Sequence, residues 1–222
     1  MKLYNLIDIE DLSMEEWQEL YSLASQIIDH PLDFADTLRG RVMASLFFEP
    51  STRTNFSFQT AMLRLGGSIF GFADPRKGET LKDTIKMVSA YADVVVMRNP
   101  REGAALAASL YSEVPVVNAG DGGHMHPTQT LADLTTITRL RGKIADLNVG
   151  LCGDLKYGRT VHSLIKALSK FPNITFTLIA PPDLALPSYM KEYLLAHQLR
   201  FIEVTNLDAA IPQLDVLYMT RV

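Results

Sequence analysis

The sequence is poor in cysteine and in long apolar runs, and each absence narrows the class of protein. Cys152 is the only cysteine, so an internal disulfide is excluded. No segment approaches the ~20 consecutive apolar residues that a membrane-spanning helix needs. The N-terminus turns acidic almost at once, without the apolar stretch of a secretory signal. Together these absences predict a cytoplasmic protein.

An excess of positive charge is also absent. The 21 lysines and arginines are outnumbered by 25 aspartates and glutamates, which gives a formal net charge of −4. Such a chain has no global field that would attract nucleic acid or an anionic membrane surface, so we expect neither as a partner. An anionic ligand would have to be bound by a local cluster of arginines.

What the sequence does contain is a regular alternation of short apolar runs and helical segments. Ser13 and Glu16 have the spacing of a capping box, which predicts a helix from there to about Ile28. Further helices are expected at 52–65, 80–91, 102–111, 128–140, 159–168 and 187–196. Strands are expected at 42–48, 68–72, 93–97, 114–118, 148–152, 174–179, 201–204 and 216–219. This order predicts an α/β protein with parallel sheets covered on both faces.

Polar segments follow five of the expected strands. The carboxyl ends of parallel strands share one edge of a sheet, where ligands of such folds bind. Four of the five segments carry an arginine and the fifth carries two histidines; these residues are Arg53, Arg98, Arg159, Arg221, His124 and His126. Their shared position predicts a polyanionic ligand that lies across the strand ends.

The segment Ser51-Thr52-Arg53-Thr54 stands where a strand passes into a helix. Free N–H groups and the positive end of the helix dipole make such a place an anion site. The hydroxyl groups add donors, and the arginine can bind two phosphate oxygens at once. The alternative is that Ser51 merely caps the helix. The segment is not a Walker loop, because the required glycines and the Gly-Lys-Ser/Thr ending are absent.

Other polar residues have plainer interpretations. His124 and His126 could bind a metal ion, but no acidic or cysteine partner stands at a recognisable spacing, so we expect none. His162 lies inside an expected helix and is interpreted as structural. Cys152 ends a buried strand and is interpreted as a small core residue.

Six stretches resemble the catalytic chains of the aspartate carbamoyltransferase family, which belongs with the ornithine carbamoyltransferases. They are Ser51-Thr52-Arg53-Thr54, Lys77-Gly78-Glu79-Thr80, Val96-Met97-Arg98, His126-Pro127-Thr128-Gln129-Thr130, the run from Gly153 to Leu164, and Tyr218-Met219-Thr220-Arg221-Val222. The second and fifth stretches are typical of the aspartate-specific branch. The resemblance implies two doubly wound domains, a carbamoyl-phosphate-binding domain at 1–127 and an aspartate-binding domain at 128–222.

The resemblance also implies roles for the residues of these stretches. Residues 51–54 would bind the phosphate of carbamoyl phosphate. Thr54, Arg98 and His126 would surround the carbonyl oxygen and form an oxyanion hole, whose donors are typically worth ~10²–10³ in turnover each. Gln129 would accept a hydrogen bond from the carbamoyl NH₂ group. No covalent nucleophile, metal or organic cofactor is implied.

Three cations are assigned to aspartate. Arg159 and Arg221 would bind its two carboxylates, a task that suits planar bidentate donors. Lys77 would reach the active site of a neighbouring subunit, which implies a homotrimer with shared sites. The implied reaction carries the carbamoyl group to the amino group of L-aspartate, in de novo pyrimidine biosynthesis. Regulatory chains are a further partner that the family allows.

Two departures from the family pattern keep rival hypotheses open. The loop at 73–76 is shorter than usual and lacks a phosphate-binding serine. The family continues beyond Val222, so we expect an incomplete second domain and, for these 222 residues alone, marginal stability and little activity. One rival is a carbamoyltransferase for another amino acceptor, although two cations suit a dicarboxylate. The other is a non-catalytic homologue that scaffolds an active trimer.

Overall fold

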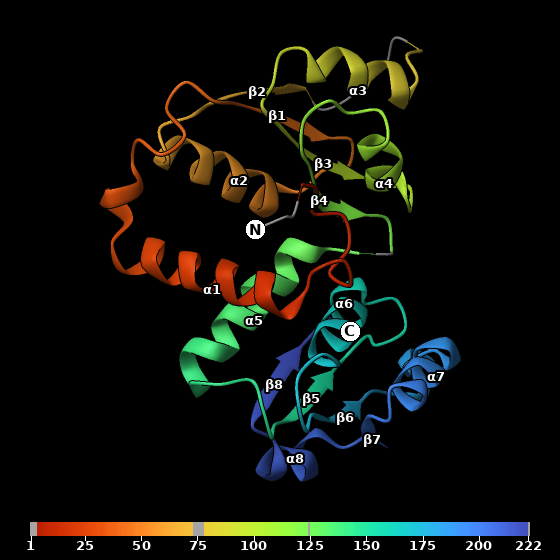
Figure 1. Ribbon diagram of the computed structural model, residues 1–222. Helices are drawn as coiled ribbons and strands as arrows, with labels where there is room; N and C mark the ends of the chain where they lie inside the picture. Colours follow the sequence, from red (N-terminus) through yellow and green to blue (C-terminus); the bar gives the residue numbers. More distant parts are fainter. Residues whose placement is uncertain (1–3, 73–77, 124, 222) are drawn as a thin grey trace. The chain divides into compact units, whose positions relative to one another are not determined.

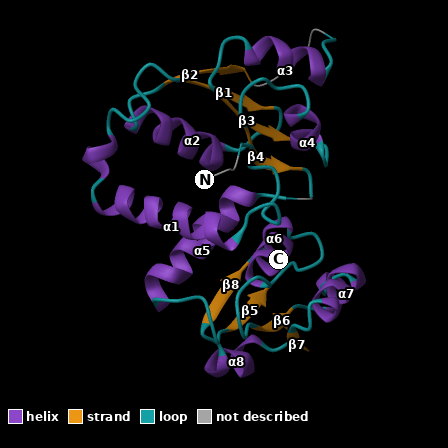
Figure 2. Ribbon diagram, viewed as in Figure 1, coloured by secondary structure: helices purple, strands orange, loops and turns teal. Residues whose placement is uncertain are grey.

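The computed structural model describes residues 4–72, 78–123 and 125–221 (Figure 1). Its backbone divides into two compact units, Met1–Thr128 and Gln129–Val222. Each unit is built on a four-stranded sheet whose strand pairs are all parallel (Figure 2). The predicted α/β class with two parallel sheets is therefore confirmed.

The sheet of the first unit has the strand order β2-β1-β3-β4. Its strands are β1 (Val42–Phe47), β2 (Ser68–Phe72), β3 (Val94–Asn99) and β4 (Val116–Asp121). The helices are α1 (Met14–Asp29), α2 (Thr52–Arg64), α3 (Leu81–Ser89) and α4 (Ala104–Ser109), with a 3-10 turn η1 at Pro31–Phe34. Leu6 adds an isolated parallel bridge to Val117 of β4, a pairing that was not predicted.

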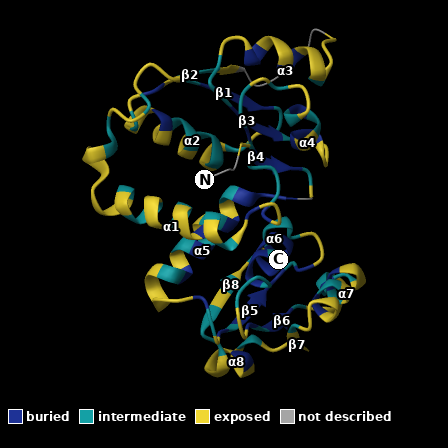
Figure 3. Cartoon of the chain, viewed as in Figure 1, coloured by how far each residue is buried: buried dark blue, intermediate teal, exposed yellow. Residues whose placement is uncertain are grey.

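Helices cover both faces of this sheet, because successive side chains of a buried strand point to opposite sides. On β1, Met43 and Phe47 pack with Met62 of α2. The residues between them, Ala44 and Leu46, belong instead to a cluster with side chains of α3 and α4. Figure 3 shows β1 and β3 among the most buried segments, as continuous apolar runs require.

Local signals account for the ends of several helices. The Ser13 hydroxyl accepts from the Glu16 N–H at 3.1 Å, and the Glu16 carboxylate accepts from the Ser13 N–H at 3.0 Å. The predicted capping box is thus confirmed. Gly66, which follows the end of α2, has a φ of +84°, a conformation that favours glycine.

The sheet of the second unit has the strand order β7-β6-β5-β8. Its strands are β5 (Asn148–Cys152), β6 (Thr175–Ile179), β7 (Arg200–Val204) and β8 (Val216–Met219). The helices are α5 (Pro127–Arg141), α6 (Arg159–Leu168), α7 (Ser188–Ala196) and α8 (Leu207–Ala210), with 3-10 turns η2 (Pro182–Leu184) and η3 (Ile211–Gln213). Seven of the ten residues of α6 are buried, which makes it the most deeply packed helix of this unit.

Several elements differ from the expected ones, most of them by a residue or two at an end. Helix α4 begins only after Gly103, whose φ of +73° lies outside the helical range, so it is shorter than the expected 102–111. Strand β4 continues to Asp121, which pairs with Asn99 after a register shift. The short helix α8 was not predicted. No helix in the described part of the chain is both long and apolar enough to cross a bilayer.

Candidate functional site

The strand ends that the sequence singled out belong to two sheets and therefore form two groups. In the first unit, β1, β3 and β4 are neighbours, so the segments after them meet at one sheet edge. The Phe48 N–H donates to the Arg98 carbonyl at 2.9 Å, and the Gly122 N–H donates to the Asn99 carbonyl at 2.9 Å. These bonds tie the three segments together. The predicted convergence is confirmed within this unit.

The start of α2 keeps its polar groups available. Ser51 stands at the N-cap position, but its side chain makes no capping hydrogen bond. The first intrahelical bond runs from the Asn55 N–H to the Ser51 carbonyl at 3.0 Å, so the N–H groups of residues 52–54 have no acceptor within the helix. The interpretation of Ser51 as a mere cap is therefore wrong.

The side chain of Asn55 fastens this helix start to β1. Its Oδ1 atom accepts from the Ser45 hydroxyl at 2.9 Å and from Gln59 Nε2 at 2.8 Å. Ser45 is buried on β1, so its bond fixes the first turn of α2 over the strand, while the bond from Gln59 lies within the helix and orients the Asn55 amide. The exposed side chain of Arg53 thus stands on a fixed backbone.

Arg98 brings a buried positive charge to the same edge. Its residue exposure is only 7%. Nη2 lies 3.2 Å from the Glu49 carboxylate, and Nη1 donates to the Ala119 carbonyl at 3.3 Å. Among the described residues, Arg98 Nε and Glu49 Oε2 are buried without hydrogen-bond partners. A buried charge that is paired on one side only favours an additional anionic partner.

Gly120 lets Arg98 and His126 approach the backbone of β4. Its φ is +119°, and a Cβ atom there would lie 3.0 Å from Arg98 Nη1 and 3.6 Å from His126 Cδ2. His126 is buried, and its Nδ1 lies 3.3 Å from the Thr128 hydroxyl. Any side chain at position 120 would therefore crowd both groups. The structure brings Arg98 and His126 together, as predicted.

Asp121 holds the loop that carries His126. One carboxylate oxygen accepts from the Met125 N–H and from Asn118 Nδ2, both at 3.1 Å. The other accepts from the Gly103 N–H at 3.0 Å. This buried aspartate is satisfied by three neutral donors, so it organises the strand end without cancelling the charge of Arg98.

The second unit has its own pair of converging strand ends. The Asp154 N–H donates to the Arg221 carbonyl at 3.0 Å. Gly153 has a φ of +115°, and a Cβ atom there would lie 2.4 Å from the Thr220 hydroxyl oxygen. The segment that leads to Arg159 therefore lies directly against the one that carries Arg221. Arg159 is partly buried at the first position of α6, and Arg221 is exposed.

His162 and Cys152 have the structural places predicted for them. The Nε2 atom of His162 lies 2.8 Å from the Leu155 carbonyl, and Nδ1 lies 3.1 Å from the Tyr189 hydroxyl. Burial lowers the pKa of His162, so the neutral ring is favoured. Cys152 packs with Ile179 in an apolar cluster, and burial raises the pKa of its thiol.

Gln129 lies in the first turn of α5. It is exposed, and its Nε2 donates to Asp133 Oδ1 at 2.9 Å. Burial raises the pKa of Asp133. Tyr218 of β8 faces the same carboxyl group and hydrogen bonds Thr160 of α6, and burial is the main cause that raises its pKa to about 12. This group of polar residues connects three elements of the second unit.

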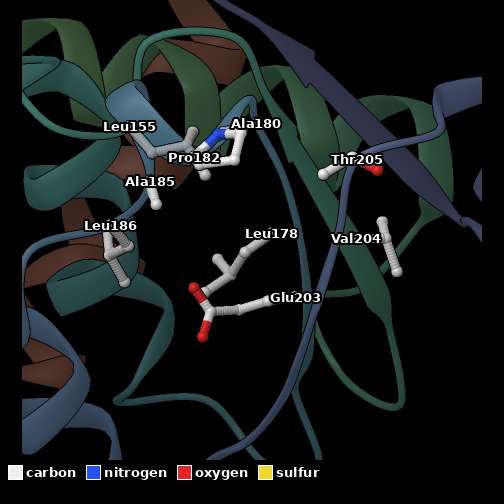
Figure 4. A pocket seen from close by; sticks show the side chains of 9 residues that line it. All are labelled: Leu155, Leu178, Ala180, Pro182, Ala185, Leu186, Glu203, Val204 and Thr205. Atoms are coloured by element: carbon white, nitrogen blue, oxygen red, sulfur yellow. The ribbon is translucent and has the colours of Figure 1, made fainter.

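A separate pocket of about 450 Å³ opens at the ends of β6 and β7 (Figure 4). Its wall is mostly apolar, and the Glu203 carboxylate points into it. Glu203 is paired with Lys191 Nζ at 2.7 Å. None of the predicted site residues lines this pocket, and an apolar wall with a carboxylate does not suit an anionic ligand. In the described part of the chain, no group of three or more potential metal ligands comes together.

A comparison with protein families shows to which family the chain belongs. The family profile described as "Aspartate/ornithine carbamoyltransferase, carbamoyl-P binding domain" matches residues 4–139. The chain belongs to this family. The carbamoyltransferase profile includes the whole first group of strand ends and continues into α5.

Relatives of the carbamoyltransferase family support the assignment along the chain. The aspartate carbamoyltransferase catalytic subunit of Clostridium novyi is 55% identical over 98% of this chain and 73% of its own length. The catalytic subunit of M. jannaschii aspartate transcarbamoylase superposes with a TM-score of 0.94 at 46% identity, over 99% of this chain and 74% of that one. The Trypanosoma cruzi enzyme in complex with N-(phosphonacetyl)-L-aspartic acid has a TM-score of 0.89 at 38% identity, over 99% and 74%.

Some features of this carbamoyltransferase chain lie outside the predictions or outside the described residues. Lys77 and His124 belong to the residues that the structure does not describe. Glu49, Asp133 and Tyr218 were not predicted as parts of the site. A weak signal existed for each: Glu49 directly precedes the 50–54 segment, Asp133 follows Gln129 by one helical turn, and Tyr218 stands in the strand that leads to Arg221.

Proposed function

We propose that the chain is an aspartate carbamoyltransferase catalytic chain, which carries the carbamoyl group of carbamoyl phosphate to the amino group of L-aspartate. The products are N-carbamoyl-L-aspartate and phosphate. The observation that carries the proposal is the buried Arg98 guanidinium beside His126 at the strand ends of a carbamoyltransferase fold. The Trypanosoma cruzi relatives solved in complex with carbamoyl phosphate, and with aspartate and phosphate, support the choice of substrates.

In this proposal the first unit binds carbamoyl phosphate. The N–H groups and hydroxyls of residues 51–54 bind the phosphate, together with the guanidinium of Arg53. Thr54, Arg98 and His126 donate to the carbonyl oxygen. A Thr128 hydroxyl that donates to His126 Nδ1 leaves the proton on Nε2, which makes that atom the donor.

The chemistry needs no covalent intermediate. The amino nitrogen of aspartate attacks the carbonyl carbon, negative charge develops on the carbonyl oxygen, and the bond to the phosphate oxygen breaks. The departing phosphate accepts the proton of the amine. Placed donors stabilise the developing charge, which is usually the largest single contribution to such catalysis.

The second unit supplies the contacts to aspartate. Arg159 and Arg221 bind its carboxylates, and Gln129 accepts from the carbamoyl NH₂ group. We further propose that Lys77 completes the site of a neighbouring subunit in a homotrimer, and that the protein is cytoplasmic. The mass of the particle in solution, measured by light scattering, tests the trimer.

Calorimetric titration with carbamoyl phosphate tests the function, with Arg53→Ala beside the parent. The matched control is Arg64→Ala, which removes an exposed arginine from the other end of the same helix. The parent and Arg64→Ala are expected to bind, and Arg53→Ala to lose about 10- to 100-fold in affinity, the usual worth of a hydrogen bond to a charged group. A folded parent that does not bind, or an Arg53→Ala variant that binds like the parent, contradicts the proposal.

A further inference from the structure

The side-chain amide of Gln129 has a defined orientation. Its Nε2 donates to Asp133 Oδ1 at 2.9 Å, one turn further along α5. An ionised carboxylate can only accept, so it must face the nitrogen end of the amide. The carbonyl oxygen Oε1 is thereby turned to the opposite side. The amide is exposed, and its hydrogen bond to Asp133 contributes to this orientation.

The burial of the Asp133 carboxylate does not favour the stability of the folded protein. Its Oδ2 atom is buried and has no hydrogen-bond partner among the described residues, although the Tyr218 phenol faces the carboxyl group. A buried acceptor without a donor lowers stability. Burial also raises the pKa of Asp133, which shows that its charged form is disfavoured there. A neutral side chain of the same shape should therefore be tolerated or even stabilising.

We propose that Asp133 is a positioning residue, which holds the Gln129 amide so that its carbonyl oxygen faces the NH₂ group of carbamoyl phosphate. The inference rests on the proposed function, since that function supplies the contact of Gln129. The new element is Asp133, which selects one of the two orientations of the Gln129 amide. The reversed orientation would present an NH₂ donor to another NH₂ donor, and the hydrogen bond would be lost.

A pair of ligands isolates this effect. Acetyl phosphate has a methyl group where carbamoyl phosphate has NH₂, and the two share the phosphate and the carbonyl. A change that only disturbs Gln129 should lower the affinity for carbamoyl phosphate and leave the affinity for acetyl phosphate unchanged. A change that disturbs the fold should lower both affinities.

The experiment measures the affinity for both ligands by calorimetry at pH 8, above the usual range of carboxyl pKa values. Asp133→Asn can donate to Gln129 Oε1 and so reverse the amide. It is expected to reduce the preference for carbamoyl over acetyl phosphate by about 3- to 10-fold, the worth of a typical hydrogen bond, with stability equal to or above that of the parent. Asp133→Ala only removes the acceptor, so its preference for carbamoyl phosphate should lie between those of the parent and Asp133→Asn. Thr136→Ala, an exposed position on the same helix, is the control and should keep the preference.

A double-mutant cycle decides whether Asp133 acts through Gln129. In a Gln129→Ala background, Asp133→Asn should have no further effect on the preference. Three results would overturn the inference: an equal loss of affinity for both ligands, an unchanged preference, or an effect of Asp133→Asn that persists without Gln129. A parent that binds neither ligand instead contradicts the proposed function itself, so the two failures are distinguishable.

Discussion

At the scale of single residues, the candidate site depends on how closely charged side chains approach the backbone. Arg98 is buried against the Ala119 carbonyl and directly over Gly120. Glu49 pairs with one side of its guanidinium and leaves Nε without a partner in the described part of the chain. The charge is therefore held in a fixed place while part of its hydrogen-bonding capacity is still available to a ligand.

Gly120→Ala tests this close approach. The new Cβ atom would lie 3.0 Å from Arg98 Nη1, so the guanidinium must move. We expect the affinity for carbamoyl phosphate, measured by calorimetry, to fall by about 10- to 100-fold, because a displaced charged donor loses its hydrogen bond. The strained φ of +119° should also lower the free energy of unfolding by about 1–3 kcal/mol.

Gly142→Ala separates the two effects. Gly142 has a φ of +80°, but an added Cβ atom meets nothing within 4 Å. This control should share the loss of stability and keep the affinity of the parent. An affinity that falls equally in both variants would mean that backbone strain, and not the displacement of Arg98, is responsible.

At the scale of elements, both sheets use the same device to align a central strand with its neighbour. Asp93 precedes β3, and its carboxylate accepts from the N–H of Val42, the first residue of β1, at 2.9 Å. Asp215 precedes β8 and accepts in the same way from the N–H of Asn148, the first residue of β5, at 2.9 Å. In each case an arginine binds the second carboxylate oxygen. This contact fixes the register of each strand pair at its beginning. The register in turn determines which residues lie side by side at the other ends of the strands.

Asp93→Asn tests the device through its pH dependence. The Val42 N–H and then Arg41 lower the pKa of Asp93 below its ordinary value of 3.8. A carboxyl group with a lowered folded pKa stabilises the protein fully above its unfolded pKa and loses this effect as the pH falls through the folded pKa. We therefore expect the variant to melt below the parent at pH 5 to 7, and the difference to shrink progressively below about pH 4.

Asp36→Asn, an exposed position in the same unit, is the control and should leave the melting temperature nearly unchanged at every pH. A constant difference between Asp93→Asn and the parent from pH 7 to pH 2 would show that shape, and not charge, explains the effect of Asp93.

Elements were largely predictable from the sequence, and contacts were not. Strands β5 and β8 and helix α6 begin and end where apolar periodicity placed them. The short helix α8 was missed, because four residues carry too little periodicity. The pairing of Glu49 with Arg98 could not be predicted, because it depends on β1 and β3 being neighbours. The same holds for Tyr218 and Asp133, which come close only through the packing of α5 and β8.

At the scale of the whole molecule, the chain assigns its two groups of cations to two compact units. Arg53 and Arg98 belong to the first unit, and Arg159 and Arg221 to the second. With a net charge of −4, the protein as a whole repels anionic substrates, so local arginines must supply the attraction. Short-range pairs outweigh the distant charges at physiological salt, because screening removes most interactions beyond about 10 Å.

This division predicts that ligand effects can be separated by hydrogen exchange. Carbamoyl phosphate should slow the exchange of the N–H groups at the start of α2, and added aspartate should slow exchange in the 153–160 segment. In Arg159→Leu the first effect should persist, and the affinity for aspartate should fall by about 30-fold or more, because the loss of one partner of a buried charge pair typically costs 2 kcal/mol or more.

Arg200→Leu provides the matched control, because Arg200 is an exposed arginine at the first residue of β7 and therefore at the opposite edge of the same sheet. It should keep both protection patterns. If Arg159→Leu abolished the response to carbamoyl phosphate as well, Arg159 would be needed for the integrity of the chain and not for a carboxylate of aspartate. If it kept the response to aspartate, the dicarboxylate would have to be bound elsewhere, and another amino acceptor would become the better hypothesis for the second unit.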